Sequence, residues 1–412
     1  MSAASPLLPP CLEGLRVVEI SAFVAAPLGG MTLAQMGADV IRIDPLQGGL
    51  DYRRWPVTAD NESLFWRGLN KGKRSVAIDT STAEGRELCQ RIIAAPGPDA
   101  GFFVTNLPAR GWMSYDALRA ARPDLVQLTL QGDRHGGSAV DYTVNPRVGL
   151  PYLTGAGSAD EVVNHVLPAW DLVAGHLLAI GLLGAERQRT RTGRGQEVRL
   201  ALEDVALAMI SHLGFVAEAQ LGAPRQRHGN ELFGAFGRDF VCADGVRIML
   251  VALTLKQWRA LCEAMQLGSA MSELGRGLGL DLDREGDRFQ AREAIAEWVA
   301  DWVGRRSFAQ ASQALQQHGV CWSRYQSLQQ LVASDPECSP ANPLFSSIDQ
   351  SGIGRTLAAG LPLNFGAGPR LEARLAPALG QHTEAVALEV AGLSSAEFGR
   401  LVDRGIVRQA KA

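Results

Sequence analysis

The segment from Leu15 to Asp44 constrains the fold more than any other part of the chain. Leu15–Ile20 is a short β-branched run typical of a buried parallel strand. Helix formers follow over Met31–Met36, and Val40–Ile43 predicts a second strand. Such a strand-helix-strand unit predicts the start of a doubly wound α/β sheet, in which ligands bind beyond the carboxyl ends of the strands.

The turn after the first strand is unusual for that architecture. Residues 21–27, Ser-Ala-Phe-Val-Ala-Ala-Pro, lack the G-x-G-x-x-G pattern that lets a dinucleotide pyrophosphate approach the backbone. The architecture therefore favours a nucleotide-like ligand, whereas the turn argues against an ordinary dehydrogenase.

Strands and helices continue to alternate through the first half, as in a parallel sheet with helices on both faces. Strands are predicted at 75–79, 101–106 and 125–130, and helices at 84–94 and 115–121. Asp171–Arg187 is apolar on all sides, which predicts a buried helix. We expect a solvated loop over 188–196 and a second helix over roughly 202–221.

The sequence changes character after residue 223, where Gly, Arg and Asn accumulate. The turn Asp244-Gly245 between two β-type runs predicts a hairpin. Helices at 255–265 and 292–303 then indicate a smaller α+β domain. Residues 339–369 are expected to be mostly irregular, and the tail over 382–407 predicts two short helices.

Composition excludes several classes of function. A net charge of −3 and a pI near 6.2 give no electrostatic case for a nucleic-acid partner. The six cysteines are scattered without a C-x-x-C pair, so we expect reduced thiols rather than a zinc site. The longest apolar run, Leu172–Ala185, is shorter than the roughly 20 residues of a membrane span. We therefore expect a cytoplasmic enzyme with no membrane partner.

Asp171 is the leading catalytic candidate. It follows Leu-Pro-Ala-Trp and precedes the apolar helix, so one interpretation is an N-cap whose carboxylate accepts a backbone N–H. The alternative is a nucleophile. Apolar neighbours would remove water and raise the pKa of this carboxyl, while the helix N-terminus would favour its anion. A poorly hydrated but ionised carboxylate can attack an acyl group.

Several basic residues could bind anionic parts of a ligand. Asn70–Arg74 and Arg110 lie beside predicted strands, where phosphates bind in α/β sheets. Arg53, Arg54 and Arg238 could each hold a substrate carboxylate through two parallel hydrogen bonds. Each could equally be a solvated charge or part of a surface ion pair.

Eight motifs occur in an order that resembles the class III CoA-transferases, a family with formyl-CoA transferase, carnitine CoA-transferase and α-methylacyl-CoA racemase among its members. From the N-terminus they are GLRVVE, AAPLGGMTLAQMGADVIRID, NKGKRSVAID, TNLPARGW, LPAWD, TGRGQEVRLAL, RHGN and APALGQHT. A single motif is weak evidence, but the eight together extend over nearly the whole chain.

The resemblance implies the α/β fold of that family, with a Rossmann-like parallel sheet, a smaller α+β domain and an interlocked homodimer. We accordingly expect a large CoA-binding domain over 1–212, a small domain over 225–325 and a return segment over 326–412 that completes the large domain.

The resemblance also implies roles for individual residues. It places Asp171 at the position of the family's nucleophilic aspartate. Positions that contact CoA correspond here to Val24, Ala25, Asp79, Thr80, Asn106, Leu107 and Arg110. Arg54 and Arg238 stay candidates for the substrate carboxylate. No metal is implied, and no cofactor beyond coenzyme A as part of the acyl-CoA substrate.

Within the family, segments such as GGLDYRRWPVT, DYTVNP and NHVLPAWD most resemble members that move CoA between the C1 and C4 carboxyls of one mesaconate molecule. That reaction would pass through an anhydride and a CoA thioester on Asp171. An intermolecular CoA-transferase and a racemase are the alternatives. Racemases of the family use a histidine upstream of the aspartate, and that position falls here at Val140 or Pro146.

Overall fold

The structure is a computed structural model that describes residues 8–157, 161–222, 225–368 and 370–410. The chain divides into two compact units. The large unit comprises Met1–Val148, Val166–Ala217 and Pro336–Ala412, and the small unit comprises Gly149–His165 and Glu218–Asp335. The chain thus leaves the large unit twice and returns to it each time.

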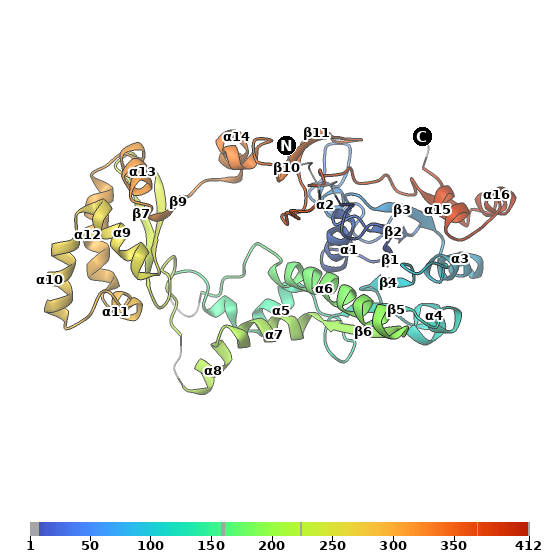
Figure 1. Ribbon diagram of the computed structural model, residues 1–412, viewed down its shortest axis with the longest axis horizontal. Helices are drawn as coiled ribbons and strands as arrows, with labels where there is room; N and C mark the ends of the chain where they lie inside the picture. The colour runs from blue at the N-terminus through green and yellow to red at the C-terminus, as the bar shows by residue number, and fades with distance from the viewer. Residues whose placement is uncertain (1–7, 158–160, 223–224, 369, 411–412) are drawn as a thin grey trace, which may run out of the picture. The chain divides into compact units, whose positions relative to one another are not determined.

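A seven-stranded sheet forms the centre of the large unit, in the order β12-β3-β2-β1-β4-β5-β6 (Figure 1). Neighbouring strands are parallel, apart from β12, which runs antiparallel to β3. The order changes direction between β1 and β4, so the ligand crevice is expected at the carboxyl ends of these two strands. The predicted doubly wound α/β sheet is therefore confirmed. The strands are β1 (Arg16–Ile20), β2 (Asp39–Asp44), β3 (Arg74–Ile78), β4 (Phe102–Thr105), β5 (Val126–Gln131), β6 (Gln196–Ala201) and β12 (Val407–Arg408).

Helices cover both faces of this sheet. One face packs on a core that includes Val18, Ile41 and Val76 of the strands and residues of α3, α15 and α16. The other face carries α1 and α6. The helices of the unit are α1 (Ala25–Gln35), α2 (Leu64–Leu69), α3 (Ala83–Ile93), α4 (Tyr115–Ala121), α5 (Asp141–Arg147), α6 (Ala169–Thr192), α7 (Leu202–His212), α15 (Thr383–Glu389) and α16 (Ser395–Asp403), with a 3₁₀ turn at Gly111–Met113.

Two glycines let α1 and α6 pack at very short range. A Cβ atom on Gly175 of α6 would lie 2.7 Å from the carbonyl oxygen of Ala25, and one on Gly29 of α1 would lie 2.8 Å from that of Gly175. Real Cβ atoms do not approach backbone oxygens so closely, so the contact requires glycine at both positions. Because Asp171 lies one turn before Gly175, this packing brings it near the start of α1.

The small unit has its own core, formed between a three-stranded antiparallel sheet and its helices (Figure 1). The predicted hairpin is present as β7 and β8, and β9 adds to β8. The elements are β7 (Phe236–Val241), β8 (Arg247–Ala252), α9 (Leu255–Met265), α10 (Gly268–Leu278), α11 (Glu285–Gln290), α12 (Arg292–Gly304), α13 (Phe308–Gln317), β9 (Cys321–Arg324) and α14 (Leu328–Ser334). The division between the units falls within α8 (Phe215–Gln220).

Five expectations about local structure are wrong. Residues 188–192, expected in a solvated loop, form the last residues of helix α6. Helix α1 begins at Ala25, so the loop after β1 is shorter than predicted. Gln196, expected at the end of a loop, and residues 197–201, for which no element was predicted, form the sheet-edge strand β6, whose first two residues are polar. The expected helix over 202–221 is interrupted at Gly214, which has a φ of 83°. Residues 339–369 contain an antiparallel hairpin, β10 (Phe345–Gln350) and β11 (Gly354–Ala359).

Helix α6 is longer than the apolar run that predicted it, because it continues through the polar residues 188–192. With 24 residues it is long and apolar enough to cross a membrane by length and composition alone. Its Ala174, Leu178 and Leu182 are nevertheless buried, and the helix packs on α1 and β5. Helix α6 is therefore a core helix of the large unit.

Candidate active site

Asp171 is the third residue of α6 and belongs to its first turn. It is not the N-cap, which is Pro168, so the capping interpretation is wrong. Among the described residues no hydrogen bond or ion pair engages the Asp171 carboxylate. The side chain that the sequence singled out is therefore available for chemistry.

A second carboxylate takes over the capping of α6. Pro168 offers no side-chain acceptor, and Asp141, the first residue of α5, accepts the backbone N–H of Trp170 at 2.7 Å and that of Asp171 at 3.2 Å through Oδ2. One turn further along α5, the Asn145 side-chain oxygen accepts the indole N–H of Trp170 at 3.1 Å. Helix α5 thus holds the first turn of α6 at two points.

The surroundings of Asp171 disfavour its charge. Burial, together with the negative charge of Asp141, raises the pKa of Asp171 from its ordinary value of 3.8 to about 7, and the positive charge of Arg54 opposes this rise. The expected desolvation of the carboxylate is therefore present. At neutral pH a large fraction is still ionised, as a carboxylate nucleophile requires.

Arg54 is the cation that acts on Asp171, and two aromatic rings hold it. Its guanidinium carbon lies 5.7 Å from the ring centre of Phe23 and 5.2 Å from that of Phe65. Cation–π contacts orient a guanidinium without consuming its N–H donors. The donors of Arg54 thus stay available for an anionic ligand next to Asp171.

The loop after β1 is held by two side chains from other segments. Asn106, after β4, accepts the N–H of Ala22 at 2.9 Å and donates to its carbonyl at 2.7 Å. Asp51 accepts the N–H of Phe23 at 3.1 Å, and Phe23 has a left-handed φ of 65°. Such a backbone conformation is uncommon outside glycine and persists only where neighbours enforce it. These hydrogen bonds therefore fix the loop at the carboxyl ends of β1 and β4, where the strand order changes direction.

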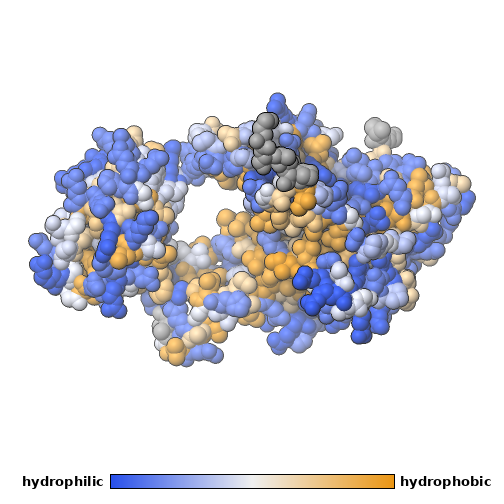
Figure 2. Space-filling view, viewed as in Figure 1, coloured by the Kyte–Doolittle hydropathy of each residue, from blue (hydrophilic) through white to orange (hydrophobic). Residues whose placement is uncertain are grey.

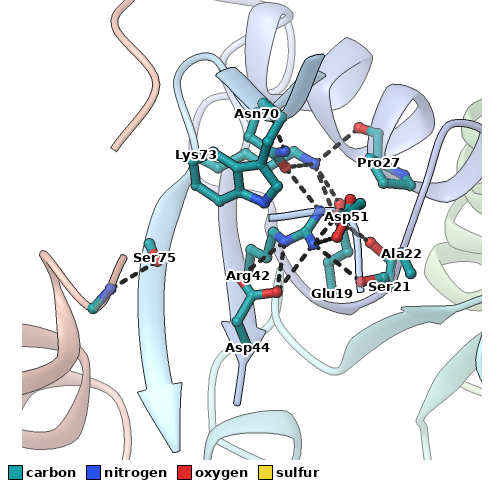
Figure 3. A network of polar contacts seen from close by, with 12 residues as sticks. Glu19, Ser21, Ala22, Pro27, Arg42, Asp44, Asp51, Asn70, Lys73 and Ser75 are labelled. Carbon is teal, nitrogen blue, oxygen red and sulfur yellow. Dashed lines mark hydrogen bonds and ion pairs between the residues drawn. The ribbon is translucent and has the colours of Figure 1, made fainter. Parts of the chain in front are cut away.

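A buried charge network lies behind this loop (Figure 3). Arg42 pairs with Asp44 and Asp51, each at 3.0 Å, and Lys73 pairs with Glu19 at 2.8 Å. Asn70 accepts hydrogen bonds from both cations, and Lys73 also donates to the carbonyl of Pro27 in α1. The network therefore connects β1, β2 and the residue before β3 with the start of α1.

The network changes the ionisation of its members. Burial lowers the pKa of Lys73 to about 8, although Glu19 opposes the change. Burial and the nearby Asp44 raise the pKa of Asp51, although Arg42 opposes the change. A single buried charge is costly, but the charged side chains of this network neutralise and hydrogen-bond one another. Lys73 is thus neither a solvated charge nor a free phosphate ligand, and the expectation for residues 70–74 is wrong at this position.

The predicted CoA-contacting residues lie at the carboxyl ends of three strands. Val24 and Ala25 follow β1 at the start of α1, Asp79 and Thr80 follow β3, and the last group follows β4: Asn106, Leu107 and Arg110. Arg110 is exposed, as a phosphate ligand would be. Hydrogen bonds from Ser81 lower the pKa of Asp79. The structure thus brings these residues to one edge of the sheet, where the fold class binds ligands.

Arg238 lies in β7 of the small unit, whereas Asp171 lies in the large unit. Its guanidinium pairs with Glu231 at 3.0 Å and with Glu293 at 3.2 Å. The alternative interpretation as a surface ion pair describes this geometry, and a role toward the substrate stays a prediction.

A cavity of about 360 Å³ opens elsewhere in the large unit, between the segment 47–62 and the return segment. Its lining combines basic, acidic and neutral polar side chains with one leucine: Gln47, Tyr52, Arg53, Asp60, Asn61, Glu62, Leu379 and Arg408. Its lining includes Arg53, one of the candidates for the substrate carboxylate, but neither Asp171 nor any predicted CoA-contacting residue, so the candidate site rests on the geometry around Asp171.

Sequence reasoning missed Asp141, Asp51 and the two aromatic rings that hold Arg54. Asp141 lies 30 positions before Asp171, and only the docking of α5 on α6 brings the two together. Asp51 follows a Gly-Gly-Leu segment that gave no signal of burial, although the residue is fully buried. These residues act through contacts between distant segments, which single-sequence patterns do not carry.

The sequence is similar to those of several known proteins. The model of CoA-transferase family III matches residues 12–383. A 2-methylfumaryl-CoA isomerase from Chloroflexus aurantiacus is 57% identical over 398 residues, which span 96% of this chain and 97% of that protein. A succinyl-CoA–L-malate CoA-transferase alpha subunit from the same species is 26% identical, over 96% of this chain and 92% of that protein.

Solved structures agree on the fold. A crystal structure of a CAIB/BAIF family protein from Brucella suis matches with a TM-score of 0.73 at 24% identity, covering 92% of this chain and 99% of that one. The family expected from the eight motifs is thus confirmed by a model match over most of the chain and by a relative of 57% identity. The chain belongs to CoA-transferase family III.

Proposed function

We propose that the chain moves CoA between the C1 and C4 carboxyl groups of mesaconate, which converts 2-methylfumaryl-CoA into 3-methylfumaryl-CoA. The observation that carries the proposal is the unpaired, partly buried carboxylate of Asp171 beside the cation Arg54, within the described residues. The high identity to a 2-methylfumaryl-CoA isomerase over nearly the full chain supports this choice of acyl group.

In the first half of the reaction, Asp171 acts as the nucleophile. A carboxylate oxygen of Asp171 attacks the C1 thioester carbonyl, and the C–S bond breaks as the CoA thiolate leaves. This gives a mixed anhydride between Asp171 and mesaconate. The thiolate then attacks the Asp171 carbonyl, so the C1 carboxylate is released and Asp171 carries CoA as a thioester.

The second half repeats these steps with the other carboxylate. The C4 carboxylate of the retained mesaconate attacks the Asp171 thioester, and the thiolate leaves again to give an anhydride through C4. Attack of the thiolate on C4 forms the product thioester and returns Asp171 as a carboxylate. Every bond that forms is balanced by one that breaks, and no redox or metal step is needed.

Two features of the chain suit this chemistry. Arg54 can neutralise whichever substrate carboxylate is not reacting, because its rings orient it while its donors stay available. The backbone N–H groups of Ala25 and Ala26 lie in the first turn of α1, where the N-cap Val24 provides no side-chain acceptor. We propose them as donors to the developing oxyanion of the thioester.

An intermolecular CoA-transferase is the second candidate, and the similarity to a succinyl-CoA–L-malate CoA-transferase subunit favours it. To separate the two, the protein is incubated with mesaconyl-C1-CoA and labelled free mesaconate, and the CoA esters are separated. Unlabelled C4 ester supports the isomerase. Label in the ester shows exchange with an outside acid, and absence of any reaction refutes the mesaconate assignment.

We also propose that the protein is a cytoplasmic homodimer. Hydrophobic side chains gather on the visible face of the large unit around α1 and α6 (Figure 2). Ile180 of α6 is 63% exposed, and Leu213, just after α7, is 69% exposed. An exposed apolar surface of this kind is typical of a protein interface. Analytical ultracentrifugation would show a species of twice the 44.1 kDa chain mass.

A further inference from the structure

Helix α6 needs an acceptor for the N–H groups of its first turn. These N–H groups have no partner within the helix, and an Asp, Asn, Ser or Thr at the N-cap usually binds them. Here the N-cap is Pro168, which has no such side chain. The acceptor comes instead from α5, since Asp141 binds the N–H groups of Trp170 and Asp171.

This arrangement fixes the backbone of the nucleophile itself. Asp141 is 1% exposed, so bulk water has little access to its carboxylate. Asn145 holds the indole of Trp170 at the same time, so the residue before Asp171 is fixed through both its backbone and its ring. The direction in which the Asp171 side chain leaves α6 follows from these bonds.

We propose that Asp141 is a positioning residue for the acyl-transfer reaction, which fixes the first turn of α6 and thereby the attack geometry of Asp171. The proposal rests on the proposed function of Asp171 as the nucleophile. A displacement of about 1 Å at a reacting group costs roughly 10²-fold in rate, so a cap at this point has a large effect on turnover.

The charge of Asp141 has a second, electrostatic effect. Asp141 of α5 and Arg54 of the loop after β2 are the charged groups that act on Asp171, and they act in opposite directions. Helix α1 brings no charged residue to the site, and Arg147 of α5 pairs with Glu203 of α7 at 2.8 Å. Removing the negative charge of Asp141 should therefore make Asp171 easier to ionise.

Two substitutions separate the hydrogen bond from the charge. Asp141→Asn keeps a side-chain oxygen that can accept the two N–H groups but has no charge. Asp141→Ala removes both. Asn145→Ala is the matched control, because it loses a hydrogen bond between the same two helices without touching the backbone of Asp171.

We expect Asp141→Ala to lower kcat about 10²-fold with little change in KM. Asn145→Ala should keep kcat within about threefold of the unmodified protein, even where its loss of thermal stability is similar. Asp141→Asn should recover most of the kcat lost in Asp141→Ala. The acid limb of its pH profile of kcat should lie at lower pH than that of the unmodified protein. Equal losses of kcat in Asp141→Ala and Asn145→Ala would show that the contact only docks the helices, and would overturn the proposal.

A titration without substrate separates this proposal from the proposed function. The Asp171 carboxyl is followed by ¹³C NMR in the full chain, with its signal assigned from Asp171→Asn. In Asp141→Asn the midpoint of this titration should move to lower pH, whatever acyl group the enzyme accepts. An unmoved midpoint overturns the role of Asp141, whereas a failed isomerase assay with a moved midpoint overturns only the mesaconate assignment.

Discussion

Replacing Asp171 with Asn should stabilise the protein, and more so the higher the pH. Burial and Asp141 raise the pKa of Asp171 from 3.8 to about 7 in the folded chain. The folded state thus binds this proton more tightly than the unfolded state does. Folding stability therefore falls as the pH rises from 3.8 to about 7, and it is level above that range. Asn resembles the protonated carboxyl in shape but cannot ionise, so it avoids this loss.

The size of the effect follows from the two pKa values. The interval from 3.8 to about 7 is worth about 4 kcal/mol, at about 1.4 kcal/mol per pKa unit. The Asp171 side chain is only partly buried, so solvent screening reduces this figure. We expect Asp171→Asn to raise the free energy of unfolding by about 2–4 kcal/mol near pH ~8.5, and by about 1 kcal/mol or less near pH ~4.5.

Urea unfolding at several pH values, followed by circular dichroism, measures this difference. Asp116→Asn is the matched control, because Asp116 also lies in the first turn of a helix, α4, but is exposed. The difference in free energy of unfolding between Asp171→Asn and the unmodified protein should increase with pH. The corresponding difference for Asp116→Asn should not. A gap for Asp171→Asn that stays constant or changes sign at high pH would refute the reasoning that its surroundings disfavour the charge.

Three further substitutions test other parts of the site. Gly175→Ala should destabilise the large unit by about 1–3 kcal/mol in urea unfolding, whereas Gly184→Ala on the same helix, whose Cβ meets open space, should be neutral or slightly stabilising. Lys73→Met should lower stability by roughly 3 kcal/mol, because the buried carboxylate of Glu19 loses the ammonium that binds both of its oxygens and keeps only the Ser21 hydroxyl and the more distant Arg42; unchanged thermal unfolding would contradict this. Arg54→Gln should move the acid limb of kcat/KM to higher pH and cut activity near neutral pH about 3- to 10-fold, because Arg54 favours the Asp171 anion. Arg54→Lys should keep the acid limb of kcat/KM at its original pH. An acid limb that does not move in Arg54→Gln would exclude the role of Arg54 in favouring the Asp171 anion.

The sequence predicts the parallel sheet well because its strands are buried on both faces. Val17, Ile41 and Phe103 are almost fully buried, and continuous apolar runs of this kind are a strong signal. Strand β6 escaped detection for the opposite reason, since it lies at the sheet edge and carries exposed polar side chains. The hairpin β10–β11 likewise has mostly partly exposed residues.

At the candidate site, the nucleophile Asp171 could be predicted from the sequence, but the residues that position it could not. Asp171 precedes a long apolar helix, which is a local signal. The contribution of Asp141 depends on the docking of α5, and that of Asp51 depends on a left-handed Phe23 that no residue preference indicates. For Lys73 the sequence offered a phosphate ligand or a solvated charge, because lysine is rarely buried, and its burial depends on the partners Glu19, Asn70 and Pro27.

The pairing of β12 with β3 has a consequence for how the chain is made. Val407 pairs with Ile78, so β3, an interior strand of the finished sheet, has no neighbour on one side until residues 407–408 have left the ribosome. The small unit, by contrast, has all of its residues once Asp335 has been synthesised. The part of the protein inserted into the middle of the chain can therefore fold first, while the part that carries Asp171 waits with an open sheet edge that can pair with other nascent chains.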